Sequence, residues 1–284
     1  MLYILLSVCC TLIVSILLKL AKRYHIDVLQ AITWNYTAAI FLTWLLFKPH
    51  VSSQMITHSN TYLAVGILLP VIFLVIAASV KFAGIVRTDV AERLSLLVPV
   101  LVSFWLYKVA LTTLTTTGIL VGFTAILFSI PWSKRGTGAG GRMAWLYLLV
   151  VFAGMGVIDV MFKQIALFKD VSYTTSIFVV FIISFITAII ILAVQITRRK
   201  TKFSFPHILI GWFLGLANFG NIVFYVKAHK AFPTSPLLVF ASVNIGVIVT
   251  GAIVGFAVFK ERLSLLNKIG IVLAIIAIII IASV

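Results

Sequence analysis

The chain has 284 residues, of which 63% are hydrophobic and 10% are charged, and 22 Lys and Arg against 6 Asp and Glu give a formal net charge of +16. A soluble domain is about half apolar and about one quarter charged. The composition therefore excludes a soluble enzyme, a disordered protein and a secreted disulfide scaffold, and it favours a protein that crosses the lipid bilayer several times.

Ten segments are apolar and have the length of about 20 residues that a helix needs to cross the hydrocarbon core. The first five are Leu2–Leu20, Val28–Phe47, Tyr62–Ala83, Val86–Tyr107 and Leu111–Ile130. After a Gly-rich basic linker, Pro131–Arg142, come Met143–Leu167, Val171–Ile196, His207–Val226, Ser235–Phe259 and Leu263–Ser283. The predicted fold class is an all-α membrane protein with ten transmembrane helices.

The excess of positive charge has an explanation that needs no nucleic acid. Lys and Arg are densest after the fifth and the seventh apolar segments, in residues 131–142 and 197–202. Cytoplasmic loops of membrane proteins are enriched in these residues. We therefore expect both loops in the cytoplasm and both termini outside, and we expect no nucleic-acid partner.

The two halves of the chain resemble each other. At an offset of 152 residues Lys108 falls on Lys260 and Gly118 on Gly270, and at an offset near 144 Lys19 falls on Lys163. Because five is an odd number of crossings, the second half must enter the membrane from the opposite side. This predicts two inverted five-helix repeats, residues 1–130 and 143–284 joined by the linker 131–142, as in many secondary transporters.

Two segments carry short motifs. Phe259–Ser264 (FKERLS), followed by Lys268–Gly270, resembles the ending of the EamA domain, and Lys81–Pro99 is similar to the passage between the third and fourth helices of that domain. Val109 departs from the pattern, because it stands where the first half should match Glu261. No role tied to that glutamate is therefore carried over to the first half.

The resemblance covers essentially the whole chain and implies a ten-helix member of the drug/metabolite transporter superfamily. It implies a carrier that exports small metabolites or drugs across the bacterial cytoplasmic (inner) membrane, with a central cavity lined by helices 1–4 and 6–9 and with helices 5 and 10 at the periphery. Such carriers are usually drawn with both termini in the cytoplasm, which is the reverse of the orientation that the charges predict.

Charged side chains within the apolar segments are costly and therefore need a partner, a wet cavity or a function. Asp159 and Lys163 lie four residues apart on one helical face, and they form either a self-neutralising ion pair or part of a cavity wall. Arg93 can hold a carboxylate or phosphate through two hydrogen bonds; the alternative is a packing network with Glu92 or Asp89. Glu92 and Asp159 are the proton-coupling candidates, since burial favours a protonated carboxyl group.

Uncharged polar residues complete the predicted site. Asn244 falls on Glu92 in the repeat, while Asn218 and Asn221 share one helical face and either bond to a neighbouring helix or face the cavity. Trp34 belongs either to an interfacial aromatic belt or to a stacking surface for substrate. The predicted substrate-binding residues are Arg93, Trp34, Asn35, Lys163, Asn218, Asn221 and Asn244.

Motifs of other chemistries are missing from the sequence. The histidines lie in loops or at predicted helix ends without metal-ligand spacing, and there is no Walker motif, so we expect no metal, no cofactor and no enzyme. The five histidines are His25, His50, His58, His207 and His229. We expect a secondary transporter of a small molecule, as a monomer or homodimer. The alternatives are a receptor, channel or assembly subunit that does not transport, and a membrane enzyme acting on a lipid-linked substrate.

Overall fold

The computed structural model describes residues 1–23, 26–50, 53–83, 85–105, 112–129, 142–198, 203–257 and 265–282. Within these ranges the chain is helical and has no strand, which confirms the all-α class. The elements are α1 (Leu2–Arg23), α2 (Val28–Phe47), η1 (Ser53–His58), α3 (Ser59–Phe82), α4 (Ile85–Leu94), α5 (Leu97–Trp105), α6 (Thr113–Ser129), α7 (Arg142–Leu167), α8 (Tyr173–Thr197), α9 (Phe205–Ala231), α10 (Pro236–Ala257) and α11 (Leu265–Ala282). The motif Phe259–Ser264, Val109 and residues 131–141 of the linker lie outside the described ranges.

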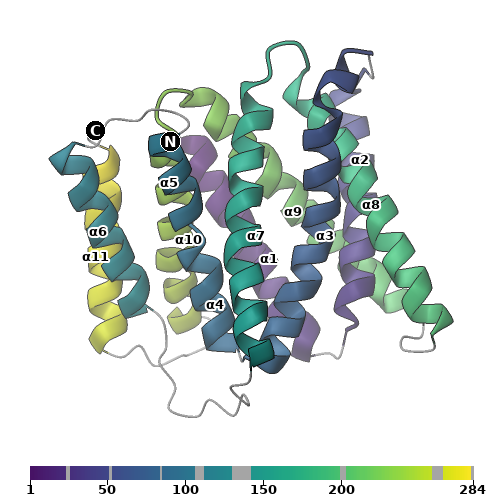
Figure 1. The fold of residues 1–284 in the computed structure, drawn as a ribbon. Coiled ribbons are helices and arrows are strands. Elements are labelled where there is room, and N and C mark those ends of the chain that lie inside the picture. The colour runs from purple at the N-terminus through teal and green to yellow at the C-terminus, as the bar shows by residue number, and fades with distance from the viewer. Residues whose placement is uncertain are drawn as a thin grey trace.

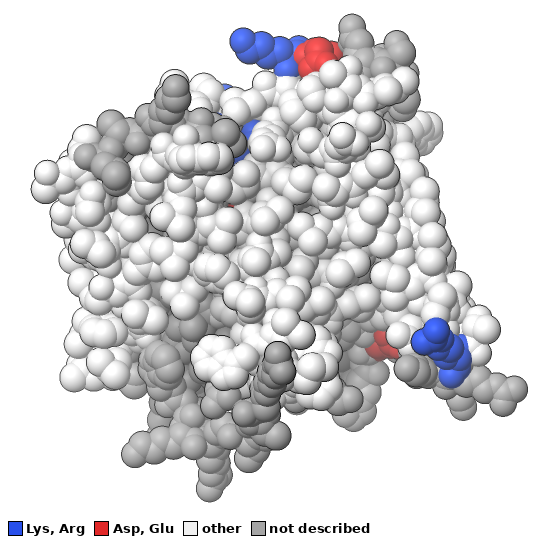
Figure 2. Space-filling model, in the orientation of Figure 1, with Lys and Arg blue, Asp and Glu red and all other residues white. Residues whose placement is uncertain are grey.

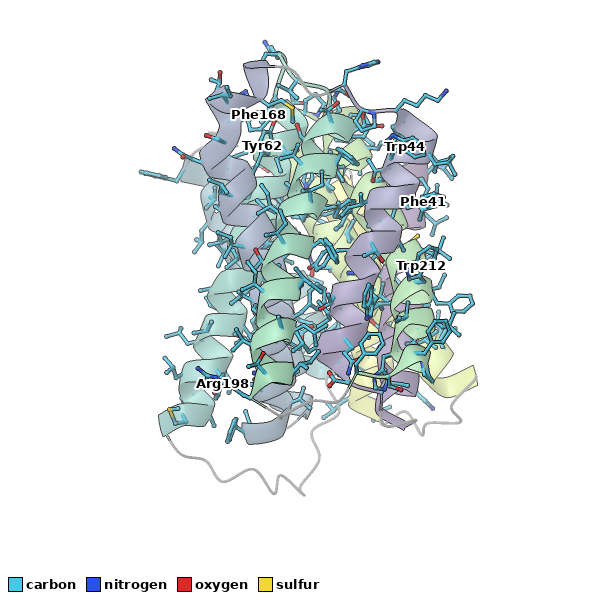
Figure 3. The ribbon with its side chains drawn as sticks, turned by 90° about the vertical axis from the view of Figure 1, so that its right-hand side faces the viewer. Phe41, Trp44, Tyr62, Phe168, Arg198 and Trp212 are labelled. Carbon is cyan, nitrogen blue, oxygen red and sulfur yellow. The ribbon has the colours of Figure 1, made fainter. Side chains whose placement is uncertain are left out.

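Length and composition indicate a membrane protein. Four described segments are long and apolar enough to cross a membrane, namely Met55–Val80, Met143–Leu167, Tyr173–Thr197 and Phe205–Ala231. On the face shown in Figure 2, the described charged side chains that protrude lie near the upper and lower ends, and the surface between these ends is uncharged. Aromatic side chains on another side of the bundle point outward, as Phe41, Trp44 and Trp212 do in Figure 3, and all three are exposed.

Local signals in the sequence fix both ends of α2. The Asp27 carboxylate accepts hydrogen bonds from the backbone N–H groups of Leu29, at 2.9 Å, and Gln30, at 3.2 Å, so it caps the helix start. At the other end Lys48 adopts a left-handed conformation with φ 43°, and its N–H donates to the carbonyl of Trp44. The observed bounds, Val28–Phe47, are those expected from the apolar run.

The fourth predicted span differs from the expectation of one helix over residues 86–107. It is interrupted at Ser95 and Leu96, so that α4 ends at Leu94 and α5 begins at Leu97. Pro99 explains the break, because it has no N–H to donate to Ser95 and a proline is tolerated in the first turn of a new helix. The Ser95 carbonyl instead accepts a hydrogen bond from the N–H of Val98 at 3.0 Å, and the Ser95 hydroxyl donates to the carbonyl of Glu92.

The helices of the two halves interleave. In the first half α1 and α2 pack mainly against α9, α3 packs against α7 and α8, and α6 pairs with α11. Figure 1 shows the α6–α11 pair at one edge of the bundle and both chain termini at the same end of it. The two predicted halves are therefore not separate globular units, since most of their contacts cross from one half to the other.

Glycines allow the tightest of these contacts. A Cβ atom added to Gly215 of α9 would lie 2.5 Å from the carbonyl oxygen of Asn35 and 2.7 Å from the Cβ of Ala38, and one added to Gly211 would lie 2.8 Å from the carbonyl oxygen of Ala31. Small residues spaced by four let helix backbones touch in a membrane, where burial of apolar side chains gives little driving force. The α2–α9 contact is therefore a close backbone contact.

A polar and aromatic cluster joins α3 to the α7–α8 connection at the end of the bundle that holds the termini. The His58 ring stacks on Phe168, with centroids 3.7 Å apart, and its Nε2 lies 2.9 Å from both carboxylate oxygens of Asp170. Tyr62 and Ser176 share a hydrogen bond of 2.9 Å. Figure 3 shows Tyr62 and Phe168 close together near this end, with Arg198 at the other.

Replacing Gly215 by Ala should destabilise the protein, because the added methyl group would meet backbone of α2 rather than a movable side chain. We expect a loss of about 1–3 kcal/mol in unfolding free energy, the usual cost of overpacking. The matched control is Gly251→Ala on α10, whose Cβ would lie 4.0 Å from the nearest side-chain atom. That variant should be neutral or more stable, since Ala favours helix over Gly by about 1 kcal/mol. Thermal unfolding in detergent measures both; equal effects would contradict the close contact.

The His58–Asp170 contact should make the stability of the folded protein depend on pH. The hydrogen bond from His58 holds the pKa of the exposed Asp170 carboxyl below its ordinary value. A lowered folded-state pKa stabilises the fold above the unfolded value, about 3.9, and this contribution is lost as the pH falls through the lowered pKa. Asp170→Asn should therefore flatten the acid side of a plot of unfolding temperature against pH, whereas Lys169→Gln should not. An identical acid limb in both variants would contradict this origin.

Candidate functional site

A cavity of about 220 Å³ lies within the bundle and is lined by α1, α3, α4, α7, α9 and α10, together with Ser95 of the α4–α5 break. Three of these helices precede the linker and three follow it. Six of the predicted site residues line the cavity, namely Glu92, Arg93, Asp159, Asn218, Asn221 and Asn244. Residues far apart in the sequence are thus gathered around one space between the two halves.

The polar wall on α9 has a helical spacing. Asn218, Asn221 and Tyr225 follow one another at intervals of three and four residues, so they share one face. The Asn221 side-chain oxygen accepts hydrogen bonds from Ser7, at 2.8 Å, and Thr11, at 2.9 Å, both on α1. These bonds fix α1 to the polar face of α9.

Asn218 connects the same face to α2. Its side-chain N–H donates to the side-chain oxygen of Asn35 at 3.2 Å, and both residues are buried. This hydrogen bond lies beside the close contact at Gly215 and satisfies two amides that would otherwise be buried in an apolar interface. Asn35 therefore supports the cavity wall through Asn218 and is not itself part of the lining.

The charged groups of the cavity come from both halves. Glu92 and Arg93 stand in the last turn of α4, where a positive side chain interacts favourably with the helix dipole, and the break at Ser95 ends the helix there. Asp159 comes from α7 and accepts a hydrogen bond from the Tyr225 hydroxyl at 3.0 Å. One guanidinium and two carboxyl groups thus share a single cavity in an apolar bundle.

Two other predicted binding residues lie outside the lining. Lys163 is fully buried one turn beyond Asp159, and its Nζ donates to the carbonyl of Pro233 at 3.0 Å. Trp34 packs edge-on against Phe203, with ring centroids 6.3 Å apart, and its indole N–H has no hydrogen-bond partner among the described residues. The structure therefore places both side chains behind the cavity wall or away from it.

Sequence reasoning missed several polar groups of this region. Ser7, Thr11 and Ser15 form a stripe at intervals of four along α1, and this spacing within an apolar run was a readable signal. His229 was expected beyond a helix ending at Val226, but α9 continues to Ala231 and buries His229 completely. The correction matters because a buried imidazole needs hydrogen-bond partners within the protein, whereas one in a loop can bond to water.

Comparison with known proteins places the chain in a family and in a fold. No family model matches it. A Haemophilus influenzae protein, described only as uncharacterized, is 37% identical over 279 residues, which cover 96% of this chain and 94% of that protein. The chain belongs to the same family as that protein. A solved structure described only as "Crystal structure of protein" superposes with a TM-score of 0.69 at 14% identity, covering 98% of this chain and 94% of the other, and this likeness concerns the fold alone.

A double-mutant cycle should measure how much the hydrogen bond between Asn35 and Asn218 contributes to stability. Each single change to Ala leaves the partner amide buried without its hydrogen bond, at a cost of about 1–3 kcal/mol. The double variant should lose less than the sum, by about 0.6 kcal/mol, the mean coupling measured for such pairs in membranes. Unfolding in detergent measures the cycle, with Asn60→Ala at the exposed start of α3 as a neutral control. Strict additivity would show that the two amides do not interact.

Proposed function

We propose that the chain is a secondary transporter of the drug/metabolite transporter superfamily, which exports a small metabolite or drug across the bacterial cytoplasmic membrane by alternating access. The observation that carries this proposal is the cavity between the two halves, which holds Arg93, Glu92 and Asp159 inside an apolar bundle. Charge within a membrane is costly and is retained along substrate and ion pathways.

The pattern of helix contacts supports two equivalent five-helix repeats. If α4 and α5 count as one span, α1, α2 and α3 of the first half correspond to α7, α8 and α9 of the second, and α4 with α5 corresponds to α10. The α1–α9 contact then corresponds to α7–α3, and the α2–α9 contact to α8–α3. The α1–α10 contact corresponds to the contacts of α7 with α4 and α5. The contacts α2–α8, α5–α10 and α6–α11 each join two corresponding helices, so the exchange of halves leaves them unchanged. All of these contacts occur. A bundle built from two repeats around a two-fold axis has this property.

The directions of the helices support an inverted arrangement. α1 starts at the end of the bundle that holds both termini, whereas α7 starts at the opposite end (Figure 1). Both termini lie at one end of the bundle (Figure 1), as expected for an even number of crossings such as ten, because an even number returns the chain to its starting side. Arg198 lies at the end opposite the termini in Figure 3, next to the basic segment after α8. We propose that this end faces the cytoplasm and that both termini face outside.

The break between α4 and α5 supports a substrate site at this place. Secondary transporters bind substrates and coupling ions where a membrane helix is discontinuous, because the ends of half-helices expose polar backbone to the cavity. Here Glu92 and Arg93 stand directly before the break and line the cavity, and Ser95 of the break lines it too. The interrupted helix therefore brings both a charge and polar backbone to the proposed site.

The cavity lining suggests roles for individual side chains. Arg93 would hold an anionic group of the substrate, Asn221 and Asn244 would bond to its polar groups, and Phe73 and Phe162 would contact an apolar part. Glu92 and Asp159 would carry the coupling proton. Trp34 and Lys163 stand outside the lining, so in this proposal they support the site from behind.

Arg93→Ala should strongly decrease transport while leaving expression and folding intact. A thermal-shift screen of the purified protein against a panel of metabolites first supplies a substrate, and uptake into proteoliposomes then measures transport. Loss of a charged hydrogen-bond donor costs about 1.5–3 kcal/mol, which corresponds to a decrease in transport of roughly tenfold or more. Arg198→Ala, at an exposed helix end, is the matched control and should transport normally.

Normal transport by Arg93→Ala would remove this residue from the site. Absence of transport by the unmodified protein for every metabolite that shifts its unfolding would contradict the carrier proposal itself. Ion conductance far above carrier turnover would identify a channel, and a partner that remains bound through purification would favour an assembly subunit.

A further inference from the structure

Beyond the cavity, α7 and α9 carry a second pair of buried polar residues. Asp159 and Tyr225 belong to the cavity wall and share a hydrogen bond. One turn further along the same helices, Lys163 and His229 are both completely buried and stand outside the lining. The two pairs succeed each other from the cavity toward the C-terminal ends of α7 and α9, which lie at the end of the bundle that holds the termini (Figure 1).

His229 has surroundings that a packing role does not explain. Neither of its ring nitrogens has a hydrogen-bond partner among the described residues, although both are buried. Its ring contacts Tyr225 edge to face, with centroids 4.7 Å apart, and Phe240 at the same separation. Buried polar groups without partners are rare in folded proteins, so each one calls for an explanation such as a function.

Tyr225 stands between a carboxylate and this imidazole. Helical side chains lean toward the helix N-terminus, so His229 leans onto Tyr225, the residue four positions before it. The Tyr225 hydroxyl meanwhile reaches Asp159 on the neighbouring helix. A single phenol thus contacts a carboxylate and an imidazole, two kinds of side chain that commonly transfer protons in proteins.

We propose that Asp159, Tyr225 and His229 form a proton relay between the cavity and the buried imidazole of His229; the proposal rests on the proposed transport function and names its coupling route. The imidazolium N–H of His229 gives its proton to the Tyr225 oxygen while the Tyr225 hydroxyl proton passes to Asp159. His229 ends as neutral imidazole and Asp159 as a neutral acid, and the reverse transfer releases the proton. Among the described residues, the other titratable group facing His229 is Lys163 on α7, while α10 presents the ring of Phe240.

In the present conformation the relay is interrupted between Tyr225 and His229, since no hydrogen bond joins them. A permanent connection would let protons pass between the cavity and His229 whether or not substrate is bound. A connection that forms only when α7 and α9 shift, or when the imidazole ring turns, instead ties proton transfer to the transport cycle. The interruption therefore suits a coupled carrier.

Hydrogen–deuterium exchange at the His229 ring N–H tests the relay without any substrate. Protein with isotope-labelled histidine is transferred in detergent to heavy water and followed by NMR, with His229→Gln assigning the signal. Deuterons should reach His229 from the cavity through Asp159 and Tyr225. Tyr225→Phe, which keeps the ring but removes the hydroxyl, and Asp159→Asn should each slow the exchange by about tenfold or more. His207, near the start of the same helix, provides an internal signal that should not change.

An unchanged exchange rate at His229 in both variants would overturn the relay. So would a change that the backbone amides of α9 share, because it would mean that the variants altered the helix and not a proton route. Failure of the transport proposal gives a different result, in which the unmodified protein moves no metabolite although exchange at His229 still depends on Tyr225. For a transported metabolite, the His229→Gln variant should still exchange labelled for unlabelled metabolite across the membrane when the pH is equal on both sides. It should no longer accumulate the metabolite when a pH gradient is applied.

Discussion

The close contact between α2 and α9 is the constraint on which the cavity depends. Lipid chains are as apolar as leucine side chains, so helices in a membrane associate through close packing and a few polar bonds. At Gly211 and Gly215 the backbone of α9 touches that of α2, leaving no room for a side chain. This contact fixes the rotation of α9, and the rotation decides that Asn218, Asn221 and Tyr225 face inward.

Similar close contacts join other helices of the two halves. Gly66 of α3 approaches the backbone of α8 near Val180, and Gly156 of α7 approaches the carbonyl of Ser95 at the break between α4 and α5. The cavity lies between these tight contacts, and its lining combines polar side chains such as Asp159 and Asn221 with apolar ones such as Leu69 and Ile158. In the proposed carrier, such close contacts would let the helices that they join move together as one body.

Much of this arrangement could be predicted from the sequence, and the predictions that were wrong have identifiable physical reasons. Long apolar runs predicted the helices, and charged or amide groups within them gathered at one cavity because lipid excludes them. The prediction of one continuous helix over residues 86–107 was wrong because Pro99 stands in the first turn of a second helix. Lys163 shares a helical face with Asp159, but this spacing gives no information about depth, and the carbonyl of Pro233 lies beyond the reach of local reasoning. His229 was overlooked because the end of an apolar run is a poor guide to the end of a helix.

The charges of the cavity restrict what the proposed carrier can couple to protons. Arg93 with ionised Glu92 and Asp159 leaves the lining with one net negative charge. An anionic substrate would add to it and favour protonation of a carboxylate, so substrate and proton would bind together and travel in the same direction, by reciprocity of linkage. Export driven by an inward proton gradient needs substrate binding to oppose proton binding. This happens when a positive group of the substrate competes with the proton for Asp159 or Glu92. An exporter with this lining therefore suits a substrate that carries both charges, its negative group on Arg93 and its positive group on a carboxylate.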